Sequence, residues 1–256
     1  MSQEKITLKT FDRQTIALDH YRNGFKKVVV LAHGFYNNKD AYLFKAIAAE
    51  LAKYYDVLVF DFRGHGKSTG LFSWTADEPK DLSVVLAYAK EQGYDQVGIV
   101  GFSLGAAVAI IEASHNRIIN SVIAVSAPFD FWQINFHFWE PEMLSDLKLN
   151  LGIKGKGKGV RPGNILKKKI KPIDVVSKIA PVPIYFIHGE KDWIIKPKHS
   201  EKLFEKALDP KKLLIIQQAG HAEKIFDSNP NQFIQECVQW FEQTLCAKTK
   251  TDEAVN

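Results

Sequence analysis

The sequence predicts an α/β fold in which a mostly parallel sheet is covered by helices on both faces. Short apolar runs without polar alternation recur along the 256 residues, and amphipathic segments lie between them. Such runs are typical of strands that are buried on both faces. Their alternation with helices is typical of a doubly wound sheet with right-handed crossovers. The expected buried strands are 27–32, 56–60, 97–100, 121–125, 182–187 and 213–216.

An antiparallel hairpin is expected to lead the chain into this sheet. Ile6 and Leu8, and later Ile16 and Leu18, alternate with polar residues on either side of the stretch 11–14. Apolar residues at helical spacing predict helices over 41–54, 81–90, 197–208 and 232–245.

One long segment interrupts the alternation, because no strand is expected between Pro128 and Lys178. We expect residues 128–178 to form a small helical cap on a core made of residues 1–127 and 179–247, with 248–256 as a flexible tail. The cap begins with six aromatic residues in eleven positions, and these either line an apolar acyl or aryl pocket or form the cap's own core. They are Phe129, Phe131, Trp132, Phe136, Phe138 and Trp139, of which Trp132, Phe136 and Trp139 are candidate substrate contacts.

Positive charge is concentrated in the same segment. Between Lys148 and Lys171 there are nine basic residues and no acidic one, whereas the formal net charge of the whole chain is +5. The run is interpreted as a solvated loop or as a source of weak attraction to anionic substrates or lipid surfaces. Nucleic-acid binding is disfavoured because no recognition motif accompanies the charge.

Several function classes find no support in the composition. The first ten residues lack an apolar signal core, and no apolar run approaches the roughly 18 residues that a membrane span requires. Only Cys237 and Cys246 occur, so one disulfide can be drawn but metal-ligand spacing is absent. We therefore expect a cytoplasmic protein with no metal and no organic cofactor.

The main catalytic signal is the pentapeptide Gly101-Phe102-Ser103-Leu104-Gly105. It falls where an expected strand passes into an apolar helical segment. A serine on such a sharp strand-to-helix turn projects its hydroxyl from the sheet, and the glycines permit the crowded backbone. Ser103 is therefore the candidate nucleophile.

A serine nucleophile needs a base, and the base needs a carboxylate that orients it. Asp192 and His221 follow two later strands, at the sheet edge where active sites of α/β proteins collect. Asp192 is preferred over Glu190 because it lies deeper in its loop, and Glu223 is expected to be solvated. His221 is preferred over two other histidines: His188 directly ends a strand, and His199 is expected on a helix surface.

Four motifs in this order make the chain resemble the α/β-hydrolase family. They are the serine turn, His33-Gly34-Phe35, the stretch DFRGHGKS at residues 61–68, and the loops HGEKD and GH that hold Asp192 and His221. The resemblance covers residues 27–245 and is closest to small carboxylesterases, lysophospholipases and monoacylglycerol lipases. It implies the α/β-hydrolase fold and an oxyanion hole formed by the backbone amides of Phe35 and Leu104. The side chain of Phe35 would then border the acyl pocket, whereas His33, Asp61, Arg63 and His65 are expected to be structural.

The resulting expectation is a serine hydrolase that cleaves small to medium acyl or aryl esters through an acyl-enzyme on Ser103. A lysophospholipase or monoacylglycerol lipase is the nearest alternative. Peptidase, thioesterase and C–C bond hydrolase activities use the same three side chains and rank lower. A non-catalytic binding protein is disfavoured because serine, aspartate and histidine are all present.

Overall fold

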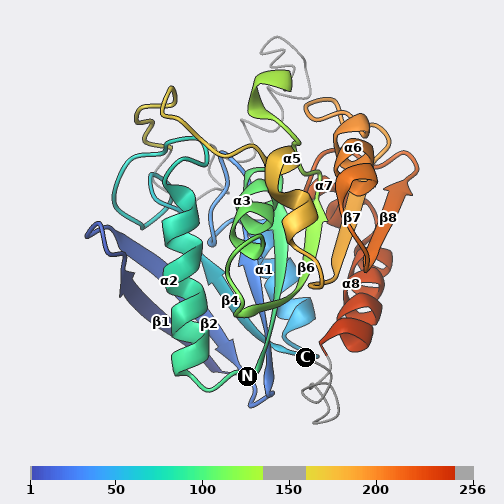
Figure 1. Ribbon diagram of the computed structural model, residues 1–256. Helices are drawn as coiled ribbons and strands as arrows, with labels where there is room; N and C mark the ends of the chain where they lie inside the picture. The colour runs from blue at the N-terminus through green and yellow to red at the C-terminus, as the bar shows by residue number, and fades with distance from the viewer. Residues whose placement is uncertain (1, 135–159, 246–256) are drawn as a thin grey trace, which may run out of the picture.

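A single eight-stranded sheet organises the protein (Figure 1). The structure is a computed structural model, and it describes residues 2–134 and 160–245. The strand order is β1-β2-β4-β3-β5-β6-β7-β8. The strands are β1 (Ser2–Lys9), β2 (Thr15–Arg22), β3 (Lys27–Ala32), β4 (Asp56–Phe60), β5 (Gln96–Phe102), β6 (Ile119–Val125), β7 (Ile184–Gly189) and β8 (Lys211–Ile216). The helices are α1 (Tyr42–Leu51), α2 (Glu78–Glu91), α3 (Leu104–Ala113), η1 (Phe131–Gln133), α5 (Pro172–Val175), η2 (Val176–Lys178), α6 (Lys198–Lys206), α7 (Lys224–Ser228) and α8 (Pro230–Thr244).

The expected amino-terminal hairpin is present. Ile6 pairs with Leu18 and Leu8 pairs with Ile16 in the antiparallel β1–β2 ladder. β2 is also antiparallel to β4, whereas every ladder from β4 through β8 is parallel. The expected α/β-hydrolase fold is therefore confirmed.

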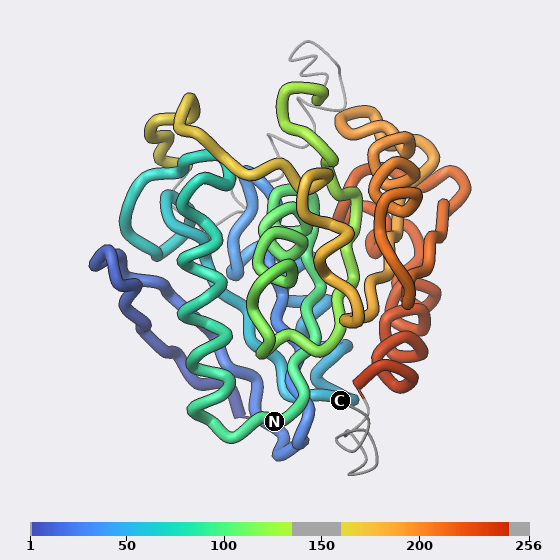
Figure 2. Tube along the Cα trace, in the orientation of Figure 1, coloured from blue at the N-terminus to red at the C-terminus, as the bar shows by residue number. Residues whose placement is uncertain are grey.

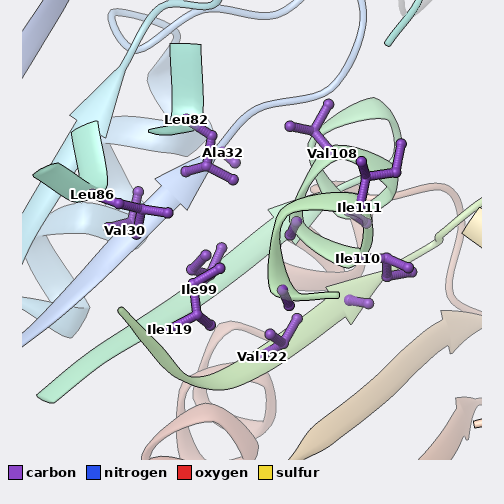
Figure 3. Close-up of a cluster of buried hydrophobic side chains, with 14 of the residues drawn as sticks. Val30, Ala32, Leu82, Leu86, Ile99, Val108, Ile110, Ile111, Ile119 and Val122 are labelled. Atoms are coloured by element: carbon purple, nitrogen blue, oxygen red, sulfur yellow. The ribbon is translucent and has the colours of Figure 1, made fainter. Parts of the chain in front are cut away.

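Each face of the sheet is covered by helices, and each face has its own apolar core. Alternate residues of one strand supply the two cores: Val28 and Val30 pack with α2 and α3, and Val29 and Leu31 pack with α1 and α8. Figure 1 shows α2 and α3 on the near side of the sheet and α1 on the far side. Figure 3 shows the near core, where Leu82 and Leu86 of α2 and Val108, Ile110 and Ile111 of α3 gather around β3, β5 and β6. Burial on both faces explains why the strands read as unbroken apolar runs.

The chain order creates a crevice at one place along the sheet edge. From β3 the chain moves to one side, to β4, and β5 then returns to the other side of β3. Ligands of open α/β sheets bind at the carboxyl end of the strands beside such a reversal. The loops after β3 and β5 contain His33-Gly34-Phe35 and Ser103, so two of the predicted motifs lie side by side there.

The described parts of the expected cap lie above this edge. Figure 2 shows the segments around residues 130 and 165 rising beyond the same end of the sheet. Asp130 precedes η1 and caps it, because its carboxylate accepts a hydrogen bond from the Trp132 amide at 3.0 Å. Val175 and Val176, at the end of the segment, are buried in the near core. Phe136, Phe138 and Trp139 lie outside the described residues, and the cap boundary at 128–178 stays a prediction.

Candidate active site

Ser103 occupies a strained turn between β5 and α3. Its backbone has φ 52° and ψ −109°, a conformation that non-glycine residues rarely adopt. The flanking glycines make this turn possible: a Cβ on Gly105 would lie 2.1 Å from the Ala32 carbonyl oxygen, and one on Gly101 would lie 2.5 Å from the Gly105 carbonyl oxygen. The expected strand–serine–helix geometry is thus present.

Two backbone amides are positioned around this serine by different loops. Leu104 is the first residue of α3, where amide N–H groups have no partner inside the helix. Phe35 follows Gly34, and a Cβ on Gly34 would lie only 3.3 Å from the Cβ of Ser103. The loop after β3 therefore packs directly against the serine turn.

Asp192 and His221 are brought together by the loops after β7 and β8. The Oδ2 atom of Asp192 lies 2.7 Å from Nδ1 of His221. The other carboxylate oxygen, Oδ1, accepts hydrogen bonds from the amides of Ile194 at 3.1 Å and Ile195 at 2.8 Å. Burial by itself would raise the pKa of Asp192, but the charge of His221 and hydrogen bonds from His188 and His221 hold that pKa well below its usual range. Asp192 is therefore an ionised, fixed acceptor.

A glycine permits the two loops to approach. A Cβ on Gly189 would lie 2.1 Å from the carbonyl oxygen of Gly220. Next to this contact, the Lys191 amide donates to the Ala219 carbonyl at 2.9 Å. The loops that carry the acid and the histidine thus form one hydrogen-bonded unit.

The end of β6 lies between this unit and the serine. The Ser103 amide donates to the Val125 carbonyl at 2.8 Å. The next residue, Ser126, accepts a hydrogen bond on Oγ from the Ala222 amide at 3.0 Å. Ser103 and Ala222, the residue after His221, are consequently anchored to two successive residues at the end of β6. Because Asp192 accepts from Nδ1 of His221, proton exchange by this ring has to pass through Nε2.

The competing residues have other contacts, and two expectations about them are wrong. Glu223 is not simply solvated, because its Oε1 accepts a hydrogen bond from Asn37 at 2.7 Å. His199 is not on a helix surface: it is 5% exposed, and its Nδ1 accepts from the Phe129 amide at 3.2 Å. It lies one turn before the buried Leu203 and therefore on the inner face of α6. Glu190 accepts from the Gln218 amide at 3.1 Å.

The DFRGHGKS stretch is a buried turn with internal partners, as expected. Asp61 accepts hydrogen bonds from the amides of Lys39 at 2.7 Å and Lys67 at 2.8 Å. Arg63 forms ion pairs with Asp81 at 2.7 Å and Asp12 at 2.9 Å. His65 donates to the Arg63 carbonyl at 3.0 Å if Nδ1 carries its proton. His33, which also has the expected bracing role, accepts on Nε2 from the Phe62 amide at 3.0 Å.

Comparison with known proteins agrees with this architecture. Residues 29–167 match the alpha/beta hydrolase family. The chain belongs to this family. Protein YfhR of Escherichia coli K12 is 24% identical over 85% of this chain and 70% of its own length. Family of serine hydrolases 2 of Saccharomyces cerevisiae is 22% identical over 76% and 78%.

Solved structures of esterases share the fold. The Pyrococcus furiosus esterase Pf2001 superimposes with a TM-score of 0.78, at 21% identity, over 96% of this chain and 94% of its own. The esterase RhEst1 of Rhodococcus sp. ECU1013 superimposes with a TM-score of 0.76, at 17% identity, over 94% and 99%. At these identities the likeness shows a common fold.

This hydrolase has an aromatic cluster beside the serine turn that sequence reasoning missed in part. The cluster consists of Phe35, Phe72, Trp74 and Phe131 and packs against Leu104. The ring of Phe35 stacks on Phe72 with centroids 4.8 Å apart and meets Trp74 edge-on at 4.7 Å. Phe72 and Trp74 were not expected here, although the run Phe72-Ser73-Trp74 directly after the DFRGHGKS turn is a local signal for them.

Trp132 lies apart from this cluster. It is 64% exposed, and the ammonium group of Lys169 lies 5.5 Å from its ring centroid. Other cations of the basic segment also have intramolecular partners: Lys167 pairs with Asp77 at 2.5 Å and Lys171 with Asp130 at 2.8 Å. Substrate contact by Trp132 stays a prediction.

Within residues 2–134 and 160–245 there is no group of three or more His, Cys, Asp or Glu side chains that could hold a metal ion. No helix in these ranges is long and apolar enough to cross a membrane. Cys237 is a buried free thiol, and Cys246 lies outside the described residues.

Proposed function

We propose that this protein is a serine hydrolase that cleaves carboxylic esters through an acyl-enzyme on Ser103. The observation that carries the proposal is the 2.7 Å hydrogen bond between Asp192 and His221, on loops anchored to the same strand end as the strained Ser103. Strain of this kind persists only where the surrounding structure enforces it, and it is concentrated at functional sites. The esterase neighbours support the same reaction class.

The reaction follows from these positions. His221 takes the hydroxyl proton of Ser103 on Nε2 as Oγ attacks the ester carbonyl carbon. Asp192, ionised and buried, stabilises the imidazolium that forms. The imidazolium then protonates the alkoxide leaving group as the carbon–oxygen bond of the ester breaks. His221 then deprotonates a water that attacks the acyl-enzyme carbonyl carbon. As the bond from that carbon to Oγ breaks, the imidazolium returns this proton to Oγ, which releases the acid and regenerates Ser103 and neutral His221.

The amides of Leu104 and Phe35 are proposed to hold the oxyanion. Both flank Ser103, and both belong to backbone that is fixed by close packing of glycines. Donors that are oriented before the reaction need no reorganisation when charge develops, and one such donor contributes about 3 kcal/mol to transition-state stabilisation.

The aromatic cluster favours esters with a medium-length acyl or an aryl group. Phe35 and Leu104 belong to this cluster, so an acyl chain bound at the oxyanion site would meet the partly exposed rings of Phe35 and Trp74. A lysophospholipase or monoacylglycerol lipase is the second candidate. Exposed apolar side chains beside the lysines of the cap favour it, among them Leu166 at 76% and Ile170 at 50% exposure.

Active-site labelling tests the serine assignment. A fluorophosphonate should label Ser103, identified by peptide mass spectrometry, and Ser103→Ala should abolish both labelling and ester hydrolysis. Ser114→Ala, at the far end of α3, is the matched control and should keep both. Labelling at another residue, or turnover by Ser103→Ala at the wild-type rate, would contradict the mechanism.

Chain length separates the two substrate classes. We expect kcat/KM for p-nitrophenyl esters, measured from acetate to palmitate, to be highest at short or medium length. Phe72→Ala should shift the optimum, because it removes the ring that stacks on Phe35. An optimum at palmitate would favour the lipase candidate.

A further inference from the structure

Asp192 has a second imidazole neighbour besides His221, which has no part in the proposed reaction. Oδ2 of Asp192, the oxygen bonded to His221, also lies 3.2 Å from Nε2 of His188. The His188 side chain is completely buried, as is that of Asp192. One carboxylate oxygen therefore faces two histidine rings from two different strand ends.

The neighbours of His188 determine which of its nitrogens carries the proton. Nε2 faces two acceptors, Asp192 Oδ2 and the Ile195 carbonyl oxygen at 2.6 Å, so it must be a donor. Nδ1 lies 2.7 Å from the hydroxyl of Ser200, which can donate to it. Ser200 is fully buried in the first turn of α6. A ring that carries a proton on Nε2 satisfies all these contacts at once.

These contacts join residues of one segment, from the end of β7 to Ile195. His188 lies in β7 one residue before the Gly189 turn, and Asp192 and Ile195 follow in the same loop. Asp192 Oδ1 is held by two backbone amides, and Oδ2 is held by His188 as well as His221. The contacts with His188 and the two amides thus fix the rotation of the carboxylate independently of His221.

We propose that His188 is a positioning residue that holds the carboxylate of Asp192 in line with His221 and shares its negative charge. The inference rests on the proposed roles of Asp192 and His221. A second donor on Oδ2 weakens the stabilisation of the His221 imidazolium in the resting enzyme. His221 consequently stays unprotonated, and able to act as a base, to lower pH. His199 of α6 is a further buried ionisable group that interacts electrostatically with both His188 and Asp192.

Two amide substitutions separate the two sides of the ring. In His188→Gln the side-chain amide nitrogen can occupy the position of Nε2 and donate to Asp192. In His188→Asn the amide reaches only the position of Nδ1, so contact with Ser200 is kept and contact with Asp192 is lost. Ser200→Ala removes the partner of Nδ1 alone. His20→Asn is the matched control, since His20 is an equally buried histidine bonded to Tyr88 and Tyr94.

We expect His188→Asn to lower kcat about tenfold with KM nearly unchanged. This is the effect expected when one hydrogen bond to a charged group is lost. Its acid limb of kcat/KM should move up by about half a pH unit, because the unshared charge of Asp192 makes His221 more basic. His188→Gln, Ser200→Ala and His20→Asn should keep the wild-type acid limb. Equal kcat and equal acid limbs for His188→Asn and His188→Gln would overturn the proposal.

A readout without substrate keeps this test apart from the proposed function. The titration of the His221 ring, followed by NMR of histidine labelled with ¹³C at Cε1, should show the same upward shift in His188→Asn. An unchanged titration would overturn the positioning role even if esters are hydrolysed. Failure of wild-type protein to hydrolyse any ester or to react with fluorophosphonate would instead reject the proposed function.

Discussion

The turn after β4 and the loops after β7 and β8 are both rich in buried charge, but they use it differently. In the turn, Asp61, Arg63 and His65 are almost fully buried and bond to backbone and to other buried groups. In the loops, Asp192 is equally buried, yet its partner His221 keeps 11% of its side chain exposed beside the serine turn. The first group is sealed from solvent, whereas the second reaches solvent at His221.

This difference shows which feature of a buried polar cluster indicates chemistry. Burial and hydrogen bonds are common to both regions, and both contain the types Asp and His. Of the two regions, only the loops hold a fixed carboxylate that bonds one nitrogen of an imidazole and leaves the other nitrogen to exchange a proton outside the cluster. Matched substitutions in the two regions should therefore separate activity from stability.

The largest contrast is expected for the two aspartates. Asp192→Asn should lower kcat by about 10⁴-fold, because an amide cannot hold His221 in the tautomer that accepts the serine proton. Asp61→Asn should leave kcat within a few fold but lower the free energy of unfolding by about 2 kcal/mol, since its amide group would face an N–H donor. Ester hydrolysis and urea unfolding of both variants test the contrast. A comparable loss of kcat in Asp61→Asn would erase it.

Arg63 should give the largest loss of stability. Arg63→Met leaves Asp81 fully buried without its guanidinium partner, and an uncompensated buried charge costs about 3–5 kcal/mol. The double variant Arg63→Met/Asp81→Leu should recover most of this loss, because no buried charge remains. Urea unfolding measures both values. If the double variant is less stable than the single one, the ion pair has a role beyond neutralising Asp81.

Much of the fold could be predicted because its signals are local. The apolar runs indicated the strands, the alternation around Ile6 and Leu18 indicated the hairpin, and GFSLG indicated the serine turn. Asp192 and His221 were chosen because each lies in a loop that follows a strand, and strand ends of a parallel sheet converge. Such features depend on a few consecutive residues.

The missed contacts are those between loops that are distant in sequence. Glu223 meets Asn37 across 186 residues, and Phe72 meets Phe35 because two loops fold toward Leu104. No periodicity marks a loop path, so the Glu223–Asn37 contact has no sequence signature. For Phe72, the aromatic run Phe72-Ser73-Trp74 is a local signal, but it does not show which loop the rings meet. His199 was different, because its spacing of four residues from Leu203 already indicated the buried face of α6.

The two buried histidines His65 and His199 should make the protein less stable in acid. Burial lowers the pKa of His65 to about 4 and that of His199 to about 4, below the usual value of 6.5. Between pH 6.5 and 4 the unfolded chain therefore binds protons that the folded chain excludes, and the free energy of unfolding falls as the pH falls. For His65 the loss across this window is about 3 kcal/mol.

Asp61 and Asp81 act in the opposite direction, because burial raises the pKa of Asp61 to about 6 and that of Asp81 to about 7. The folded protein takes up these protons before the unfolded chain does, which offsets part of the loss between pH 7 and 4. Urea unfolding at pH 7 and pH 4.5 measures the sum. His65→Gln should flatten the dependence and Asp61→Asn should steepen it. A dependence that neither variant changes would show that these two side chains are less sealed than their burial indicates.

The smallest effect is expected for Lys167, which lies in the basic segment 148–171 and pairs with a residue just before α2. Lys167 pairs with Asp77, the residue before α2, but it is half exposed, and Asp77 also pairs with Lys80 at 2.8 Å. Lys167→Met should therefore lower the free energy of unfolding by only about 0.5 kcal/mol, the usual contribution of an exposed ion pair. Lys168→Met is the control, because Lys168 is exposed and has no recorded ion pair within the described residues. If both variants weaken the hydrolysis of an anionic ester at low salt but not at high salt, the basic segment attracts the substrate through its electric field. A loss of stability above about 2 kcal/mol in Lys167→Met would instead show that Lys167 contributes like the buried ion pairs of the turn.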